Sequence, residues 1–309
     1  MKNNSTVTSD LVMLFGQRDD GVIGLPCLTF DGRVIETSYF FGTKHPKNIV
    51  AISSQAGCPM QCVFCELGSQ RFARNLTPEE MRDQVALALG EAKRQGFDQA
   101  GAPYKINVAN CGEPLLNPLL VDGLELIGAA PKTVKVSTVF PFGEKIWSNF
   151  ERLAEYASGL RGQVMQIQVS LISTDEATRA ALVGGGAADF AKISAAGKYW
   201  RQKNPNGRKI NLSLLIDEKT PCHPSAVAGV FPPEHFRLRF REYVPTQNGH
   251  RHALVAATQA RLAAVMAEAA KAGYEVGDWA SPTPVERRFG LAANTIRERY
   301  LNMVEGQKI

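Results

Sequence analysis

The stretch Gly57-Cys58-Pro59-Met60-Gln61-Cys62-Val63-Phe64-Cys65 decides the fold, because it sets three cysteines in the spacing C-x3-C-x2-C. Fe–S clusters are held by cysteine thiolates, and a four-iron cluster normally has four such ligands. Three thiolates on one short loop therefore leave one iron without a protein ligand. An open coordination position of this kind is where a metal centre does its chemistry. The stretch predicts a [4Fe–4S] cluster with one open iron.

Structural zinc and free thiols are the alternative interpretations of these cysteines. Zinc prefers two C-x2–4-C pairs, or a cysteine pair with a histidine pair. The other cysteines (Cys27, Cys111 and Cys222) are scattered singly, and no two histidines stand at helical spacing. The polar start Lys2-Asn3-Asn4 and the clustering of the thiols favour a reducing cytoplasm over disulfide bonds. No apolar run approaches the ~20 residues of a membrane span, so we expect no membrane association.

Composition is that of an ordinary globular protein. The 309 residues are 44% hydrophobic and 21% charged, and the net charge is +5. This length suits one large α/β domain or two smaller ones. The modest positive charge is compatible with an anionic partner without requiring one.

Apolar strands alternate with helical patterns after an N-terminal hairpin. Residues 11–41 carry short β-like runs, broken by Asp19-Asp20-Gly21 and Asp31-Gly32. Six strands are expected near Asn48–Ser53, Lys105–Ala109, Thr133–Val139, Met165–Ile172, Ile210–Ile216 and Phe236–Val244. Helical patterns are clearest in Met81–Arg94, Ile146–Ala157 and Thr258–Ala272, the first preceded by a capping box at Thr77 and Glu80.

This alternation predicts a parallel sheet covered by helices. Six strands are too few to close an eight-stranded barrel, so the expected fold is α/β, a partial (β/α)6 TIM-like barrel with a short N-terminal β-hairpin extension. We expect the β extension at 1–47, the barrel at 48–250 and a helical segment at 251–309 that completes it. Functional groups should lie at the carboxyl ends of the strands. Polar runs stand there: Asn110–Glu113, Ser137-Thr138, Ser170–Ser173 and Thr246–Asn248.

The cysteine spacing, with Phe64 before the last cysteine, resembles the radical S-adenosylmethionine (SAM) signature. More specifically, the chain resembles the RlmN/Cfr-like group of ribosomal-RNA adenine C-methyltransferases. The matching stretches are Ser53–Cys58, Gln70–Leu76, Gly112–Asn117, Val136–Thr138, Val169–Leu171 and the hairpin Asp31–Thr37. The resemblance implies the radical SAM fold, a [4Fe–4S] cluster and SAM as cofactors, and reductive cleavage of SAM to a 5′-deoxyadenosyl radical.

The resemblance also implies roles for single residues. Cys58, Cys62 and Cys65 would ligate the cluster, and the backbone near Phe64 would contact adenine. Gly112 and Glu113 would bind the amino end of the methionine moiety, where a carboxylate suits an ammonium group. Ser137 and Ser170 would bind the ribose or the carboxylate. Gln247 falls where the family has an asparagine that contacts SAM, and Ile172 where it has a histidine. Glu36 falls where the family has a proton acceptor, although a glutamate on a hairpin is otherwise often solvated.

Two cysteines of the family have no counterpart in the sequence. The family's thiol seven residues before the first cluster cysteine is Ala51 here, and no cysteine follows Cys222, so a methyl-carrying thiol is missing from Val285–Ala293. A thiolate is the nucleophile that takes a methyl group from SAM. Cys111, beside Gly112, is the candidate for a replacement thiol with a catalytic role. Otherwise it is a small buried residue, because free cysteine packs like a hydrophobe.

Arg237, Arg239 and Arg241 alternate along the last predicted strand, so their side chains share one face. If helices cover the apolar face, the arginines point into the barrel and can hold a phosphate or carboxylate. The alternative is an edge strand with its arginines in solvent.

These observations predict a radical SAM enzyme that abstracts hydrogen from an anionic small-molecule or nucleotide-like substrate, with a reductant such as flavodoxin or ferredoxin. The alternative is an RlmN/Cfr-like RNA C-methyltransferase that uses a different thiol or a cysteine-independent route. A non-catalytic Fe–S binding module is the third possibility, and the polar strand ends argue against it.

Overall fold

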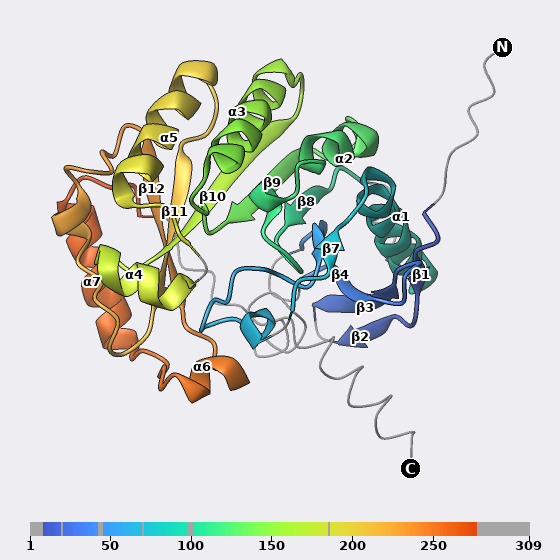
Figure 1. Cartoon of the computed structure of the whole chain (residues 1–309), viewed down its shortest axis with the longest axis horizontal. Coiled ribbons are helices and arrows are strands. Elements are labelled where there is room, and N and C mark those ends of the chain that lie inside the picture. The colour runs from blue at the N-terminus through green and yellow to red at the C-terminus, as the bar shows by residue number, and fades with distance from the viewer. Residues whose placement is uncertain are drawn as a thin grey trace.

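A single ten-stranded sheet organises the protein, as the computed structural model shows for residues 9–19, 21–42, 46–69, 71–97, 102–184 and 186–276 (Figure 1). Its order is β1-β3-β4-β5-β8-β9-β10-β11-β12, with β2 paired to β3. The strands are β1 Val12–Met13, β2 Gln17–Asp19, β3 Val22–Leu28, β4 Val34–Phe40, β5 Ile49–Ile52, β8 Lys105–Val108, β9 Thr133–Thr138, β10 Val164–Ile172, β11 Ile210–Ile216 and β12 Phe236–Glu242. A second, two-stranded sheet joins β6 (Gln55–Ala56) to β7 (Arg74–Asn75).

The six strands from β5 to β12 run parallel, which confirms the predicted (β/α)6 arrangement. In the part of the chain that the structure describes, β1 and β12 end the strand order and do not pair with each other, so the barrel is open. The carboxyl ends of the parallel strands therefore lie along one edge, where functional loops collect.

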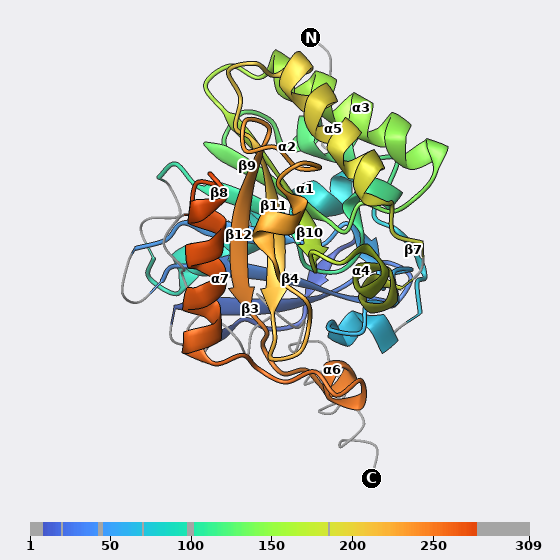
Figure 2. The same ribbon diagram turned by 90° about the vertical axis from the view of Figure 1, so that its left-hand side faces the viewer.

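Helices cover the outer face of this sheet (Figure 1). They are α1 Pro78–Arg94, α2 Leu120–Ile127, α3 Glu144–Gly159, α4 Glu176–Val183, α5 Phe190–Lys203 and α7 Gln259–Lys271. The short helix α6 Gln247–Arg251 lies instead beyond the end of the sheet, beside the 3₁₀ turn η1 Glu66–Ser69 (Figure 2). The other 3₁₀ turns are η3 Pro114–Leu116 and η4 Pro224–Val227. α1 begins with the predicted capping box, in which Thr77 and Glu80 satisfy each other's backbone N–H groups. A 3₁₀ turn, η4, stands between β11 and β12, and α7 packs beside β12 (Figure 2). No helix among the described residues combines the length and the apolarity that crossing a bilayer requires.

Side-chain alternation gives the sheet two different faces. On β9, Val134 and Val136 are buried in the main apolar core, whereas Lys135 and Ser137 line an inner cavity. On β12 the same division separates Leu238 from its neighbouring arginines. The core thus lies between the sheet and its helices, and the inner wall of the open barrel is polar.

The N-terminal strands extend the same sheet. β3 and β4 pair antiparallel, and β4 pairs antiparallel with β5. The predicted turn at Asp31-Gly32 joins β3 to β4, and Gly32 has a φ of +75°, which favours glycine. The predicted boundary at 250 falls inside α6, and the division into 1–47, 48–250 and 251–309 stays a prediction.

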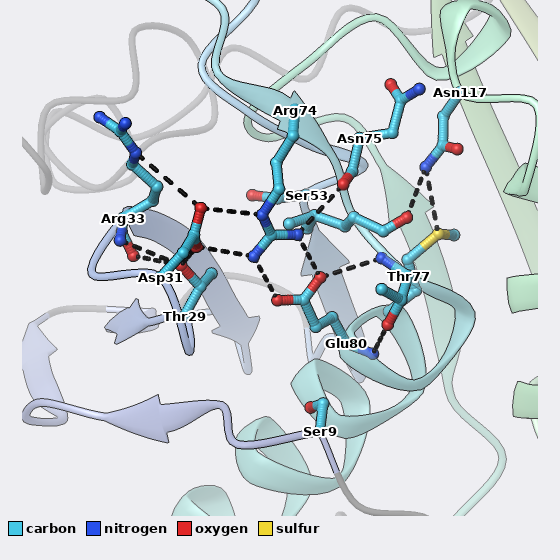
Figure 3. Close-up of polar contacts among 12 residues, drawn as sticks. Ser9, Thr29, Asp31, Arg33, Ser53, Arg74, Asn75, Thr77, Glu80 and Asn117 are labelled. Atoms are coloured by element: carbon cyan, nitrogen blue, oxygen red, sulfur yellow. Dashed lines mark hydrogen bonds and ion pairs between the residues drawn. The ribbon is translucent and has the colours of Figure 1, made fainter.

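Arg74 ties the hairpin to the first helix at the base of the cysteine loop (Figure 3). Its guanidinium donates to both carboxylate oxygens of Glu80 at 2.8 Å, and to those of Asp31 at 2.8 and 3.0 Å. Glu80 is 1% exposed and also accepts from the Thr77 N–H at 2.9 Å. Bidentate pairs of this kind fix orientation as well as charge.

Replacing Arg74 should therefore destabilise the fold. Arg74→Met leaves the buried Glu80 carboxylate without its cation, and we expect the free energy of unfolding to fall by roughly 3 kcal/mol. Urea denaturation followed by circular dichroism measures this change. The control is Arg33→Gln, because Arg33 has a 60% exposed side chain 4.0 Å from Asp31, and exposed pairs of this kind contribute less than about 1 kcal/mol. Equal losses for both variants would contradict the assignment.

The ion pair between Arg74 and Asp31 predicts that the stability of the fold is sensitive to acid. Hydrogen bonds from Arg74 hold the pKa of Asp31 well below its usual range. A carboxyl with a depressed pKa stabilises the fold above its unfolded-state pKa of about 4, and that stabilisation is lost as the pH falls further. Denaturation at a series of pH values below 5 should show a shallower decline in stability for Arg74→Met than for the wild type.

Candidate functional site

The cysteine loop stands at the carboxyl end of β5, and the pairing of β6 with β7 closes its base. Gly57 enters the loop with φ +74°, and a Cβ at this position would lie 2.1 Å from the Arg71 carbonyl oxygen. Gly68 leaves the first turn, and a Cβ there would lie 2.1 Å from the Cys62 carbonyl oxygen. Glycine is therefore required at both ends of the loop that carries the three thiols.

A distant segment after β12 holds the same loop. The Asn248 side-chain amide donates to the carbonyl oxygens of Cys62 at 3.2 Å and Cys65 at 3.1 Å. The Thr246 hydroxyl donates to the Phe64 carbonyl at 3.3 Å, and the Gln247 N–H donates to the Glu66 carboxylate. Thr246 also caps α6 through the Gly249 N–H. The polar run 246–248 was predicted as a strand-end cluster, but the anchoring role of Asn248 was not.

The three cysteines of the loop lie together on one cavity. Cys58 and Cys62 are 9% and 5% exposed, all three thiols line one cavity, and no disulfide joins any of the six cysteines. Within the described ranges, no three His, Cys, Asp or Glu side chains converge closely enough to hold one metal ion. A zinc site needs such convergence, whereas in a cubane each thiolate binds a different iron. Ligation of a [4Fe–4S] cluster by these three thiols stays a prediction.

Burial raises the pKa of each loop thiol, to about 11 for Cys65. A positive charge lies behind the loop at Arg179 of α4, which is 1% exposed. Its guanidinium donates to the Ala188 carbonyl at 2.6 Å and to the Val139 carbonyl, and its charge acts on Cys62 and Glu113. The positive charge of Arg179 lowers the electrostatic cost of holding several negative thiolates close together in a buried loop. Nothing in the sequence marks Arg179 beyond its place on an amphipathic helix.

Glu113 is buried beside the cysteine loop and lines the same cavity. Its carboxylate accepts from the backbone N–H groups of Leu115 at 3.1 Å and Val139 at 2.8 Å, and from the Thr138 hydroxyl. Burial raises the pKa of Glu113 to about 7 despite these hydrogen bonds. A carboxylate whose charged form is disfavoured by burial is stabilised by a cationic partner such as an ammonium group.

Gly112 sets the position of Glu113. Its φ is +107°, and a Cβ would lie 2.6 Å from the Cβ of Gln55. The Gln55 side-chain carbonyl then accepts from the Glu113 N–H at 2.8 Å. The Gly-Glu pair is thereby fixed against the strand that precedes the cysteine loop.

Several other predicted residues meet in this cavity, which has a volume of about 1010 Å³. Its lining includes Phe64, Ser137, Ser170 and Ile172. The Ser137 hydroxyl is buried and finds no hydrogen-bond partner among the described residues, as expected of a group that binds a ligand. Ile172 has φ +69° at a bulge between β10 and β11, which turns its side chain toward the cavity.

Gln247 is placed differently. Its side chain is exposed and is not part of the cavity lining, although its backbone joins the anchor on Glu66. A contact between Gln247 and SAM stays a prediction.

Glu36 and Cys111 lie close to the cysteine loop. Glu36 is fully buried in β4, and its charge acts on Cys65. Cys111 is 1% exposed and packs in one apolar cluster with Cys58 and Cys62, whereas Cys27 and Cys222 pack in the main core. The structure thus brings both residues to the site, and their catalytic roles stay predictions.

Ala51 and the β12 arginines line the cavity as well. Ala51 faces it from β5, where the resembling family has a thiol. Arg237, Arg239 and Arg241 face it from β12, which confirms that the arginines point into the barrel. The C-terminal stretch Val285–Ala293 lies outside the described residues.

Comparison with known proteins connects this geometry to one group of enzymes. The chain is 33% identical over 173 residues to the dual-specificity RNA methyltransferase RlmN of Desulfotalea psychrophila, across 52% of this chain and 43% of that protein. It is 31% identical over 209 residues to the probable RlmN of Deinococcus deserti, across 64% of this chain and 55% of that protein. The chain thus spans about half the length of the curated relatives it matches. No protein-family model matches the sequence.

A solved structure has the same fold. A radical SAM methyltransferase from Sphaerobacter thermophilus superposes with a TM-score of 0.73 at 20% identity, over 92% of this chain and 81% of that one. RlmN-type radical SAM methyltransferases use a [4Fe–4S] cluster, which the cysteine loop predicts here, and SAM, which the resemblance implies. This chain shares the fold of that protein, and the predicted resemblance to the RlmN/Cfr-like group is confirmed.

Proposed function

We propose that this protein is a radical SAM methyltransferase that acts on RNA. The observation that carries the proposal is the convergence of the three loop cysteines, Gly112, Glu113 and Ser137 on one cavity at the carboxyl ends of parallel strands. The relatives are named as RNA methyltransferases, and they favour the alternative predicted from sequence over hydrogen abstraction from a small molecule.

The chain's own residues would hold and orient the cofactors. A bound cluster with SAM supplies one-electron cleavage of the sulfonium and a methyl donor. Cys58, Cys62 and Cys65 would ligate three irons, while Glu113 would accept the ammonium group of the methionine moiety. Ser137 would donate its unused hydroxyl to the ribose or carboxylate. The apolar cluster around Cys58 and Met60 would keep water away from the reacting sulfonium.

Methyl transfer must follow a route without the two family thiols. Ala51 has no proton to exchange, and the sequence has no cysteine after Cys222. Cys111 packs in the same cluster as the ligand cysteines, so it is the replacement thiol that the described geometry favours. Glu36, buried near Cys65, would accept the substrate proton. The electron donor, a flavodoxin or ferredoxin, and the cytoplasmic location stay predictions.

A second function is favoured by one observation. Cations line the inner wall of the cavity, as expected if the substrate is an anionic small molecule from which hydrogen is abstracted.

Incubation of the anaerobically reconstituted protein with SAM, dithionite and bacterial ribosomal RNA separates the two functions. We expect S-adenosylhomocysteine and a methylated nucleoside in the digested RNA. Deoxyadenosine with unmodified RNA would overturn the methyltransferase proposal.

Cluster binding should depend on each loop cysteine. Cys62→Ala removes one of three ligands, and we expect the iron content after anaerobic reconstitution to fall by more than half, together with the absorbance near 400 nm, on the order of what ligand loss causes at such sites. The matched control is Cys222→Ala, because Cys222 is buried in the main core away from the loop. Zinc in the wild-type protein, or full iron in Cys62→Ala, would contradict the assignment.

SAM affinity should depend on the charge of Glu113. Glu113→Gln keeps the shape and loses the charge-assisted hydrogen bond, so the Kd for SAM should rise about 10-fold or more, a free-energy change of about 1.5–3 kcal/mol. Equilibrium dialysis with reconstituted protein measures this. Glu125→Gln, on the exposed side of α2, is the control and should bind like the wild type. An unchanged Kd for Glu113→Gln would remove Glu113 from the SAM site.

A further inference from the structure

The inner wall of the barrel is polar along its whole height. Strand pairing places Ala51, Asn107, Lys135 and Gln166 in one row across β5, β8, β9 and β10. The next rows are Ser137, Gln168, Asn211 and Arg237, then Ser170, Ser213 and Arg239. All of these side chains line the cavity. A polar wall around so large a space suits a polar ligand rather than an apolar one.

Positive charge dominates this wall. The carboxylates that line it are Glu113, Glu242 and Glu275, as far as the described residues go. Glu113 accepts three hydrogen bonds beside the cysteine loop and is assigned to SAM, and Glu242 has an interaction of its own. Glu275 accepts from Lys209 at 2.8 Å and from Arg237. Glu275 thus pairs with two of the cations that line the cavity, Lys209 and Arg237.

Three further cations have no such partner. Within the described ranges, the side chains of Lys135, Arg239 and Arg241 form no ion pair or hydrogen bond. Their charges act on one another across the lumen, from β9 on one wall to β12 on the other. Burial, followed by the charges of Arg241 and Arg239, lowers the pKa of Lys135 to about 7. The side chains of Lys135 and Arg239 are half-buried, and Arg241 is exposed to the open lumen. Like charges held close together are unfavourable until an anion joins them, and most so for the two half-buried groups.

We propose that Lys135, Arg239 and Arg241 form a subsite for a phosphate group of the substrate, inside the barrel. Two guanidinium groups offer paired N–H donors that match phosphate oxygens, and an ammonium adds a point charge. Lys135 stands two residues before Ser137 on β9, about 7 Å deeper along the strand. Arg239 is level with Ser170 on β12, and Arg241 lies two residues nearer the carboxyl end of that strand. The subsite therefore lies beside the predicted SAM position, between β9 and β12, where a substrate would meet the cofactor. This inference rests on the proposed function, because it assigns the ligand of the same cavity.

The phosphate has two possible sources. It is the phosphodiester of an RNA chain whose target nucleotide enters the barrel, or the terminal phosphate of a free nucleotide. The probes are adenosine, 5′-AMP and the dinucleoside monophosphate ApA, titrated calorimetrically into the reconstituted full-length protein. We expect 5′-AMP, ApA or both to bind about 10-fold or more tightly than adenosine, since the phosphate adds charge-assisted hydrogen bonds. Preference for ApA identifies the RNA backbone, and preference for 5′-AMP alone identifies a free nucleotide.

Lys135→Gln and Arg239→Gln should each abolish most of this preference and leave the affinity for adenosine unchanged. Arg152→Gln is the control for charge, because Arg152 pairs with Asp122 on the surface. Lys135→Arg keeps the charge and should retain most of the preference. Equal binding of 5′-AMP, ApA and adenosine by the wild type, or an undiminished preference in both glutamine variants, would overturn the subsite.

A stability readout separates this role from a structural one. If the cations await an anion, removing one relieves repulsion, so the urea midpoint of Lys135→Gln without ligand should match or exceed that of the wild type. A lowered midpoint would mean that Lys135 supports the fold, and would overturn the proposal. Iron content and SAM affinity are measured in the same variants and should not change. A preference for phosphate without methylation of RNA would refute the proposed function and leave the subsite supported. Methylation of RNA without a preference for phosphate would support the proposed function and refute the subsite.

Discussion

The alternation of side chains along six parallel strands is the constraint on which the rest of the structure depends. Residues such as Val134 and Val136 point outward and are buried under the helices, so their neighbours must point inward. In a closed eight-stranded barrel those inward residues would pack against one another. Here the barrel is open, and the inward residues surround a cavity instead. The apolar face stabilises the fold, which leaves the polar face available for ligands.

The cysteine loop needs support from both ends of the chain, because a loop of this length cannot fix three thiols by itself. Arg74 secures its base to Asp31 and Glu80, as Figure 3 shows, and Asn248 holds its carbonyl oxygens from beyond β12. The two supports are more than 170 residues apart in sequence (74 and 248). The positions of the three thiols therefore depend on contacts from segments that follow both the first and the last parallel strand. The site can be complete only when β12 has joined the sheet.

Much of the fold could be predicted from patterns among neighbouring residues in the sequence. The six strands, the capping box at Thr77 and the turn at Gly32 depend on neighbouring residues, and all three were predicted correctly. β3 lies within the region 11–41 that was predicted only as short β-like runs, and its Pro26 stands inside the strand opposite Glu36. Asn248 and Arg179 could not be assigned, since their partners lie far away in the sequence. Roles that depend on tertiary contacts leave no periodic signal.

One departure from RlmN lies at a different level of the cavity from the residues of the cysteine loop and the Gly-Glu pair. The cysteine loop, Gly112 and Glu113 form the rim at the strand ends, where cofactors bind. Ala51, which replaces a family thiol, shares its row with Lys135 on the inner wall. Rim residues come from loops and wall residues from strands, so either set can change while the other is kept. A chain that keeps the rim and alters the wall would retain the cofactor chemistry and direct it to a different part of the substrate.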